Sequence, residues 1–167
     1  WIGLALTAGY YFQTQGLLYT TPAKSGFITG LSVVLVPIGA AIFLHQRIDL
    51  AAIVGVTLAA VGLGLLSLNA TMTLNLGDVL TFCCAIAFAC HILLVGYYAP
   101  SFSPWSLGAG QILVAAVAST ALALLTWPAG GLPPITQNVV TAVLISGLLG
   151  TAFAFTVQSA AQRFTSA

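Results

Sequence analysis

The sequence predicts an all-α polytopic membrane protein with about six transmembrane helices. The chain has 167 residues, of which 60% are hydrophobic and 3% are charged, and its mean hydropathy is +1.12. A soluble domain commonly has about a quarter of its residues charged, so this chain needs a bilayer as its solvent. Its apolar runs are continuous and about 20 residues long, which is typical of spanning helices and not of the alternating strands of a membrane barrel.

The first three expected helices occupy the N-terminal part of the chain. They cover residues 1–19, 26–44 and 50–68. We expect Pro37 to kink the second of them, because a proline frees a backbone carbonyl in a membrane helix. The glycines of the third suit close helix–helix approach. A polar elbow at residues 15–29 joins the first helix to the second.

The last three expected helices lie in a stretch of 84 residues, from Val79 to Gln162, that carries no charge. Breaker clusters at 99–104 and 128–134 divide it into helices at 78–98, 105–127 and 136–158. We expect Asp78 to be the N-cap of the fourth helix. Aromatic residues fall at the predicted ends, as an interfacial belt requires: Tyr97, Tyr98, Trp105 and Trp127.

The few charges suggest an orientation in the membrane. Lys24 lies on one side of the predicted spans, whereas Arg47 and Arg163 lie on the other. The positive-inside rule then places the loop at 45–49 and the end near Arg163 in the cytoplasm.

The two ends of the chain resemble each other weakly. When residues 1–23 are aligned with residues 145–167, six positions are identical, which shared membrane composition also explains. The matched helices are five spans apart and would therefore cross the membrane in opposite directions. This arrangement is an inverted repeat, which is typical of many secondary transporters.

The elbow GLLYTTPAKSGFI, residues 16–28, resembles the junction of helices 3 and 4 in EamA-type transporters of the drug/metabolite transporter superfamily. Residues 77–91 look like the start of the second EamA unit, and residues 158–167 look like the counterpart of the elbow. The resemblance implies ten helices in two inverted five-helix repeats, of which this chain would be an internal part holding helices 3 to 8. Residues 1–68 would end the first repeat, 69–77 would connect the repeats, and 78–167 would begin the second.

Six polar residues inside the expected helices are candidates for solute binding. Tyr10, Gln13 and Thr14 share one helix face, and that face should point into the bundle because polar groups facing lipid are costly. There they either bind solute or only hold the helices together, and Thr14 can instead bond its own helix backbone. Gln111 and Gln158 are single amides that either line a cavity or bond a neighbouring helix. His91 either relays a proton that couples transport to a pH gradient or serves as a neutral hydrogen-bonding residue, and we favour the second interpretation.

Other chemistry has little support in the sequence. Cys83, Cys84, Cys90 and His91 share neighbouring helix faces, but cysteine is also an ordinary small core residue. The sequence has no Ser/His/Asp cluster, no paired acids and no phosphate-binding loop, so we expect no enzyme, no metal and no cofactor. A net charge of +1 indicates no nucleic-acid partner.

We therefore expect a secondary transporter that works by alternating access, with the lipid bilayer and a small solute as its partners. The resemblance implies export of amino acids or similar metabolites across a bacterial plasma membrane. A neutral or zwitterionic solute fits best, because no Lys or Arg lies mid-span to bind a phosphate. A proton is a candidate coupling ion, and the sequence leaves the oligomeric state open. The alternatives are a membrane scaffold that tolerates loss of Gln13, Gln111 and Gln158, and a metal-dependent membrane enzyme.

Overall fold

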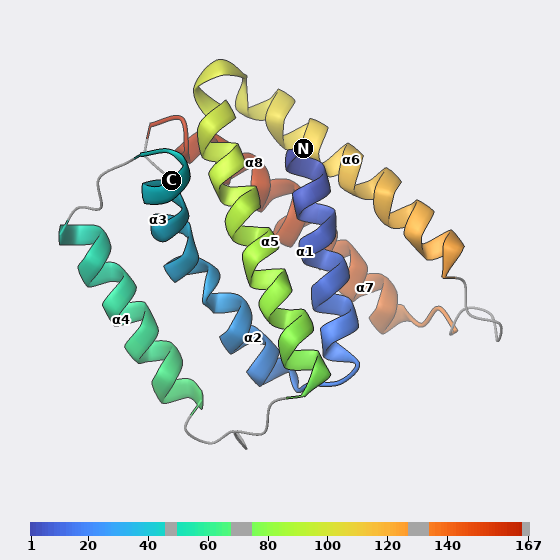
Figure 1. Cartoon of the computed structure of the whole chain (residues 1–167). Helices are drawn as coiled ribbons and strands as arrows, with labels where there is room; N and C mark the ends of the chain where they lie inside the picture. Colours follow the sequence, from blue (N-terminus) through green and yellow to red (C-terminus); the bar gives the residue numbers. More distant parts are fainter. Residues whose placement is uncertain (46–49, 68–74, 127–133, 165–167) are drawn as a thin grey trace. The chain divides into compact units, whose positions relative to one another are not determined.

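The computed structural model describes residues 1–45, 50–67, 75–126 and 134–164, and all its regular elements in these ranges are helices (Figure 1). The chain forms two compact units. Unit 1 comprises Trp1–Thr7 and Val95–Ser166, and unit 2 comprises Ala8–Leu94. Helices α1 (Ile2–Leu17) and α5 (Leu76–Tyr98) each run through both units.

Unit 2 contains most of α1 and α5 together with α2 (Pro22–Gly30), α3 (Ser32–Phe43) and α4 (Leu50–Ser67). Helix α4 packs against α2 and α3. The elbow begins α2 by a standard device: the Thr21 hydroxyl accepts a hydrogen bond from the Lys24 backbone N–H at 3.3 Å, and Pro22 occupies the first turn. A hydroxyl cap followed by a proline whose φ is already helical is a strong helix start.

The prediction for the second helix was wrong about its start and about its continuity. It begins at Pro22 rather than near Gly26, because the Thr21 cap and Pro22 start the helix earlier. It is also interrupted at Leu31, whose N–H bonds the Ile28 carbonyl at 3.1 Å in a tighter turn. Helix α3 continues through Pro37, so the break lies before the residue at which a kink was expected.

Unit 1 contains the ends of α1 and α5 and the C-terminal helices. A short 3₁₀ turn (Ala99–Ser101) leads from α5 to α6 (Pro104–Leu125), which Ser103 caps by accepting a hydrogen bond from the Ser106 N–H at 3.0 Å. Helix α7 (Gln137–Ile145) passes into a π-helical segment (Ser146–Phe153) and then into α8 (Ala154–Ala161). Helix α6 packs against α8 and against the π-helical segment.

The sixth expected helix is therefore not one regular α-helix. Its middle turns are π-helical, and the Thr151 hydroxyl bonds the Ser146 carbonyl five residues earlier at 3.1 Å. Within the described residues, the remaining expected helices agree with α1, α4, α5 and α6 to within a few residues. Arg47, Asp49, Trp127, Thr165 and Ala167 lie outside the described residues.

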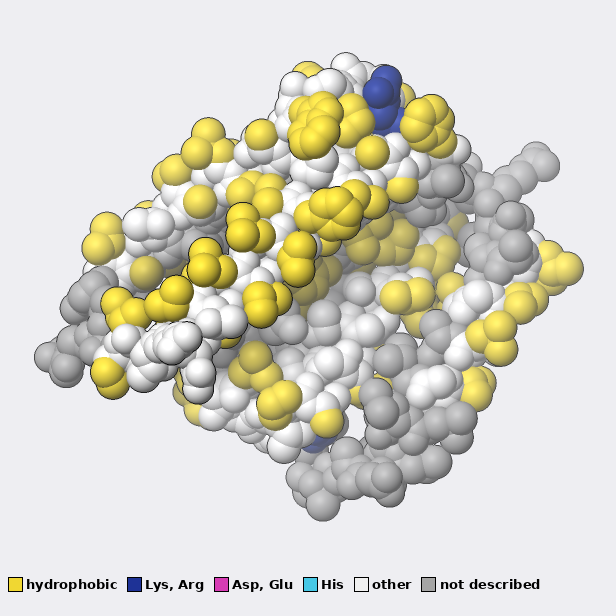
Figure 2. All heavy atoms as spheres, turned by 180° about the vertical axis from the view of Figure 1, so that it is seen from behind, with side chains coloured by type: hydrophobic (Ala, Val, Ile, Leu, Met, Phe, Trp, Pro, Cys, Tyr) yellow, Lys and Arg dark blue, Asp and Glu magenta, His cyan; other side chains and the backbone are white. Residues whose placement is uncertain are grey.

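The surface of the described residues is largely apolar. Figure 2 shows hydrophobic side chains across the visible face, with few basic ones. Such side chains as Val117 (64% exposed) on α6 and Leu149 (62% exposed) in the π-helical segment suit contact with lipid. Four described helical stretches are long and apolar enough to cross a membrane: Pro22–Phe43, Leu76–Ser101, Pro104–Leu125 and Gln137–Ala161.

Candidate functional site

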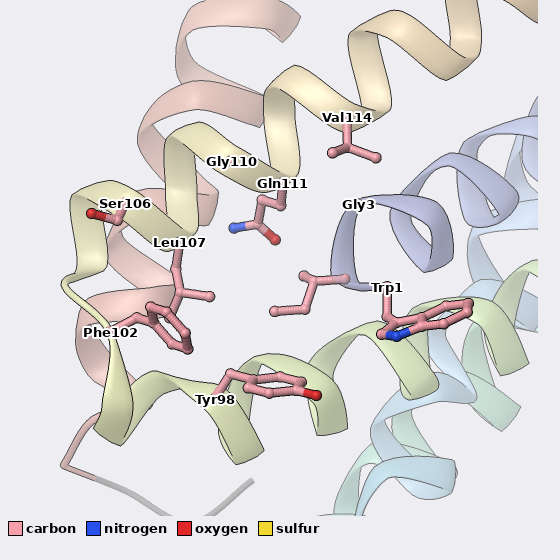
Figure 3. Close-up of a pocket in the computed structure, with 10 residues that line it drawn as sticks. Trp1, Gly3, Tyr98, Phe102, Ser106, Leu107, Gly110, Gln111 and Val114 are labelled. Atoms are coloured by element: carbon pink, nitrogen blue, oxygen red, sulfur yellow. The ribbon is translucent and has the colours of Figure 1, made fainter.

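A pocket of about 460 Å³ lies within unit 1 (Figure 3). It is formed by the first turn of α1, the end of α5 with the segment that follows it, and the first half of α6. Aromatic side chains line one wall, and α6 forms the other. None of its lining residues is charged: Trp1, Ile2, Gly3, Tyr98, Phe102, Ser106, Leu107, Gly110, Gln111 and Val114.

Gln111 is the buried polar residue of this pocket. Its side chain is 3% exposed and points from α6 into the pocket (Figure 3). The amide Nε2 donates to the Ser159 hydroxyl at 3.3 Å, and that hydroxyl donates to the Phe155 carbonyl at 2.8 Å. This chain ties α6 to α8 and fixes the orientation of the amide, as a polar group inside a membrane protein requires.

A second hollow in unit 1, of about 510 Å³, runs along Trp105 and the π-helical segment. Its polar side chain is Thr156, whose hydroxyl donates to the Ala152 carbonyl at 2.8 Å. The hydroxyl is therefore bonded to its own helix. The other residues that line the hollow are apolar, so it has fewer groups that could hydrogen-bond a solute than the first pocket has.

A charged cluster in unit 2 joins the elbow to the start of α5. The Lys24 Nζ lies 2.6 Å from one carboxylate oxygen of Asp78, and the Thr20 hydroxyl donates to the other at 2.9 Å. The side chain of Asp78 is 2% exposed, and that of Lys24 is 17% exposed. A carboxylate so deeply buried needs such a partner, because an unpaired charge there would be costly.

The expected capping role of Asp78 was wrong in its position. Asn75 is the residue whose side-chain oxygen accepts the Asp78 N–H, at 3.0 Å, and the Asp78 carboxylate accepts the Asn75 N–H in return, at 2.8 Å. This is a reciprocal capping arrangement with the acid in the first turn. Asp78 thus accepts a hydrogen bond at the N-terminal end of α5 and also forms the ion pair with Lys24.

Two glycines allow the elbow and α5 to meet closely within unit 2. A Cβ atom on Gly77 would lie 2.6 Å from the Gly16 carbonyl oxygen and 2.8 Å from the Thr20 backbone nitrogen. Both atoms belong to the backbone and cannot swing away. Glycine is therefore required at position 77 for Thr20 and Lys24 to reach Asp78 in this arrangement.

Four of the candidate residues from the sequence lie in unit 2. The Tyr10 ring meets Phe88 of α5 edge-on, with ring centroids 5.8 Å apart. His91 is buried in α5, Gln13 is half-buried, and Thr14 is exposed. Their role in solute binding stays a prediction.

The other two candidates lie in unit 1, and only Gln111 lines the pocket. Gln158 is half-buried in α8, where its Nε2 donates to the Gln162 side-chain oxygen at 3.3 Å. The three cysteines carry free thiols, and Cys84 lies 3.9 Å from the Thr29 hydroxyl. Within the part of the chain that the structure describes, no three His, Cys, Asp or Glu residues come together as metal ligands would.

The comparisons with known proteins agree with this helical, apolar architecture. Residues 1–68 match the EamA-like transporter family. The EamA-like assignment rests on these residues of the chain. The chain is also 34% identical over 164 residues to an uncharacterized transporter of Archaeoglobus fulgidus. That match covers 98% of this chain and 52% of the relative, so the chain spans about half the length of the curated relative it matches. No solved structure matches the chain.

The EamA-like family and the apolar helices together identify an integral, multi-pass membrane protein. Sequence reasoning missed the ion pair between Lys24 and Asp78, although a signal was present. These are isolated charges of opposite sign at the edges of apolar segments, and pairing is the usual way to place such charges near a bilayer. It also missed Trp1 and Phe102 as pocket residues, because aromatic side chains near helix ends are usually assigned to the membrane interface.

Proposed function

We propose that this EamA-like chain is part of a secondary transporter that moves a small neutral or zwitterionic metabolite by alternating access, with export as its direction. The observation that carries the proposal is the family match, to which the uncharged pocket in unit 1 adds support. A dianionic solute such as a sugar phosphate needs Arg or Lys in its site, and the pocket offers neither.

We also propose where the protein lies in the cell and that it is not an enzyme. The protein would lie in the plasma membrane of a prokaryotic cell, and we favour a bacterial one as the family resemblance implies. It would act as a transporter without enzymatic activity and without a bound metal or cofactor. The proton remains the candidate coupling ion, with the buried His91 as the residue to test.

The test is flux through the full-length protein that carries this chain, reconstituted in liposomes. Labelled net-neutral amino acids, nucleosides, sugar phosphates and organic cations are each offered with and without a proton gradient. Saturable flux of a neutral or zwitterionic class supports the proposal, and dependence on the gradient would identify the proton as the coupling ion. If folded protein moves no solute class, the scaffold alternative is favoured and the transporter proposal is overturned.

The residue-level part of the proposal is tested in the same liposomes. Gln13→Leu and His91→Gln are compared with the wild type for flux of the best solute. A residue that binds solute raises KM when it is replaced, whereas a residue that only holds the helices together changes thermal stability instead.

A further inference from the structure

We propose that the pocket in unit 1 binds the flat apolar part of an aromatic solute, and that the Gln111 amide binds its polar group. This inference rests on the proposed transport function and gives it a class of substrate. The pocket is formed entirely by residues of unit 1.

The size and the walls of the pocket suit an aromatic ring. Its volume of about 460 Å³ falls in the range of small-molecule sites, roughly 300–1,000 Å³. Tyr98 and Phe102 lie with their ring centroids 6.3 Å apart and their planes at 61°, and Trp1 continues the same wall (Figure 3). Aromatic rings attract another ring in such edge-to-face or offset geometries. Leu107 and Val114 close the opposite side.

Gln111 supplies the polar recognition. Because its Nε2 donates to Ser159, which is itself anchored to the Phe155 carbonyl, the amide is held in one orientation. An amide oxygen can accept two hydrogen bonds, so it can receive a hydroxyl, an amide N–H or an ammonium group of the solute. Ser159 is therefore a positioning residue, since it acts on the solute only through Gln111.

The absence of charge among the ten lining residues restricts the solute further. An anion would lose its hydration without gaining a cationic partner. The class that fits is a solute of zero net charge with an aromatic ring and one hydrogen-bond donor near it. Phenylalanine and phenylacetamide share the benzyl group, and the polar end is zwitterionic in the first and an uncharged amide in the second.

Two glycines of the structure provide matched variants. A Cβ atom added to Gly110, at the pocket, would have no atom within 4 Å, and the same holds for Gly26 on α2, outside the pocket. The Cβ atom of a leucine at position 110 therefore meets no neighbour, and the rest of its side chain would take up space at the pocket. Gly26→Leu makes the same change of side chain in a helix that does not line the pocket.

The experiment measures equilibrium binding of labelled phenylalanine and phenylacetamide to the full-length protein in detergent, with serine and glucose 6-phosphate as comparison probes. We expect the two ring probes to bind and the comparison probes to bind at least about tenfold more weakly. Gly110→Leu should weaken ring binding by about tenfold or more, whereas Gly26→Leu leaves it unchanged. Gln111→Leu should weaken binding about tenfold, because one hydrogen bond is lost, and Ser159→Ala should give a smaller loss.

The outcomes separate this inference from the proposed function. Saturable flux of some solute together with wild-type ring binding by Gly110→Leu would overturn the pocket assignment and leave the transporter intact. Ring binding that is sensitive to Gly110→Leu, with no flux of any solute, would support the pocket and overturn transport. Failure of the folded wild-type protein to bind either ring probe would also overturn the inference. Should Gly110→Leu fail to fold, Phe102→Ala, an exposed wall residue, replaces it in the same comparison.

Discussion

At the residue scale, the ion pair between Lys24 and Asp78 joins two nearly buried charges of unit 2, with the Lys24 Nζ 2.6 Å from a carboxylate oxygen of Asp78. It joins the elbow after α1 to the first turn of α5, which are 54 residues apart in the sequence. The Thr20 hydroxyl and the Asn75 backbone N–H also donate hydrogen bonds to the same carboxylate. A chain with so few charges gains from placing two of them together, since each alone would need water that the bilayer lacks.

We expect Lys24→Met to destabilise the protein by about 3 kcal/mol, because the buried Asp78 carboxylate loses its counter-charge. The double variant Lys24→Met/Asp78→Leu should lose less than the sum of the two single variants, since no charge is then left unpaired. Chemical denaturation or thermal melting in detergent measures this, with Lys24→Arg as a control that keeps the pair. Additive losses would mean that the pair contributes nothing.

A second residue-scale prediction concerns the contact between the elbow and α5. Gly77→Ala should be strongly destabilising, because its Cβ would overlap the Gly16 carbonyl oxygen and the Thr20 nitrogen. Gly26→Ala adds the same methyl group where it meets nothing, and it should be neutral or slightly stabilising. Equal melting temperatures for the two variants would contradict this account of the contact.

At the element scale, the helix starts are set by short polar sequences between apolar runs. Three helix starts have a side chain that accepts an N–H group left without a partner in the first turn: Thr21, Ser103 and Asn75. A proline follows the cap in the first two. The π-helical segment Ser146–Phe153 is the irregular part of α7–α8. Such segments are often found at functional sites, and this one packs against α6, which carries Gln111.

We expect Thr21→Val to lower stability by about 1 kcal/mol, because the Lys24 N–H loses its cap. Thr57→Val is the matched control, since the Thr57 hydroxyl bonds only the Ile53 carbonyl of its own helix, at 2.8 Å, and caps nothing. The difference in melting temperature between the two variants is the measurement. A control variant that loses as much as Thr21→Val would show that the cap has no specific effect.

At the scale of the whole molecule, we expect the basic residues to set the membrane orientation. Lys24 in the elbow and Arg163 beyond α8 are expected on opposite sides, with Arg163 in the cytoplasm. In a variant of the full-length protein without its native cysteines, Tyr19→Cys should react with an impermeant maleimide added outside intact cells. Arg163→Cys should react only after the cells are opened. Labelling of both from outside would refute the orientation and the number of spans between these sites.

Composition and hydropathy were enough to predict the solvent, the helical class and the approximate positions of the helices. The physical reason is that a bilayer forces each spanning segment to close its backbone hydrogen bonds internally, so that length and apolar composition suffice to predict a helix. The same property made Gln111 a candidate, because an amide among apolar residues must find a partner. The family resemblance, which the comparisons confirm, came from the elbow at residues 16–28.

Tertiary structure alone decided which polar groups meet. The Lys24–Asp78 pair and the Gln111–Ser159 hydrogen bond join residues 54 and 48 positions apart, and no local pattern specifies such a separation. The break at Leu31 and the π-helical segment were also beyond prediction, because each is a local change of hydrogen bonding within an apolar run whose composition suits a regular helix equally well. Helix formation is a local consequence of the solvent, whereas the pocket and the ion pair depend on how the helices pack.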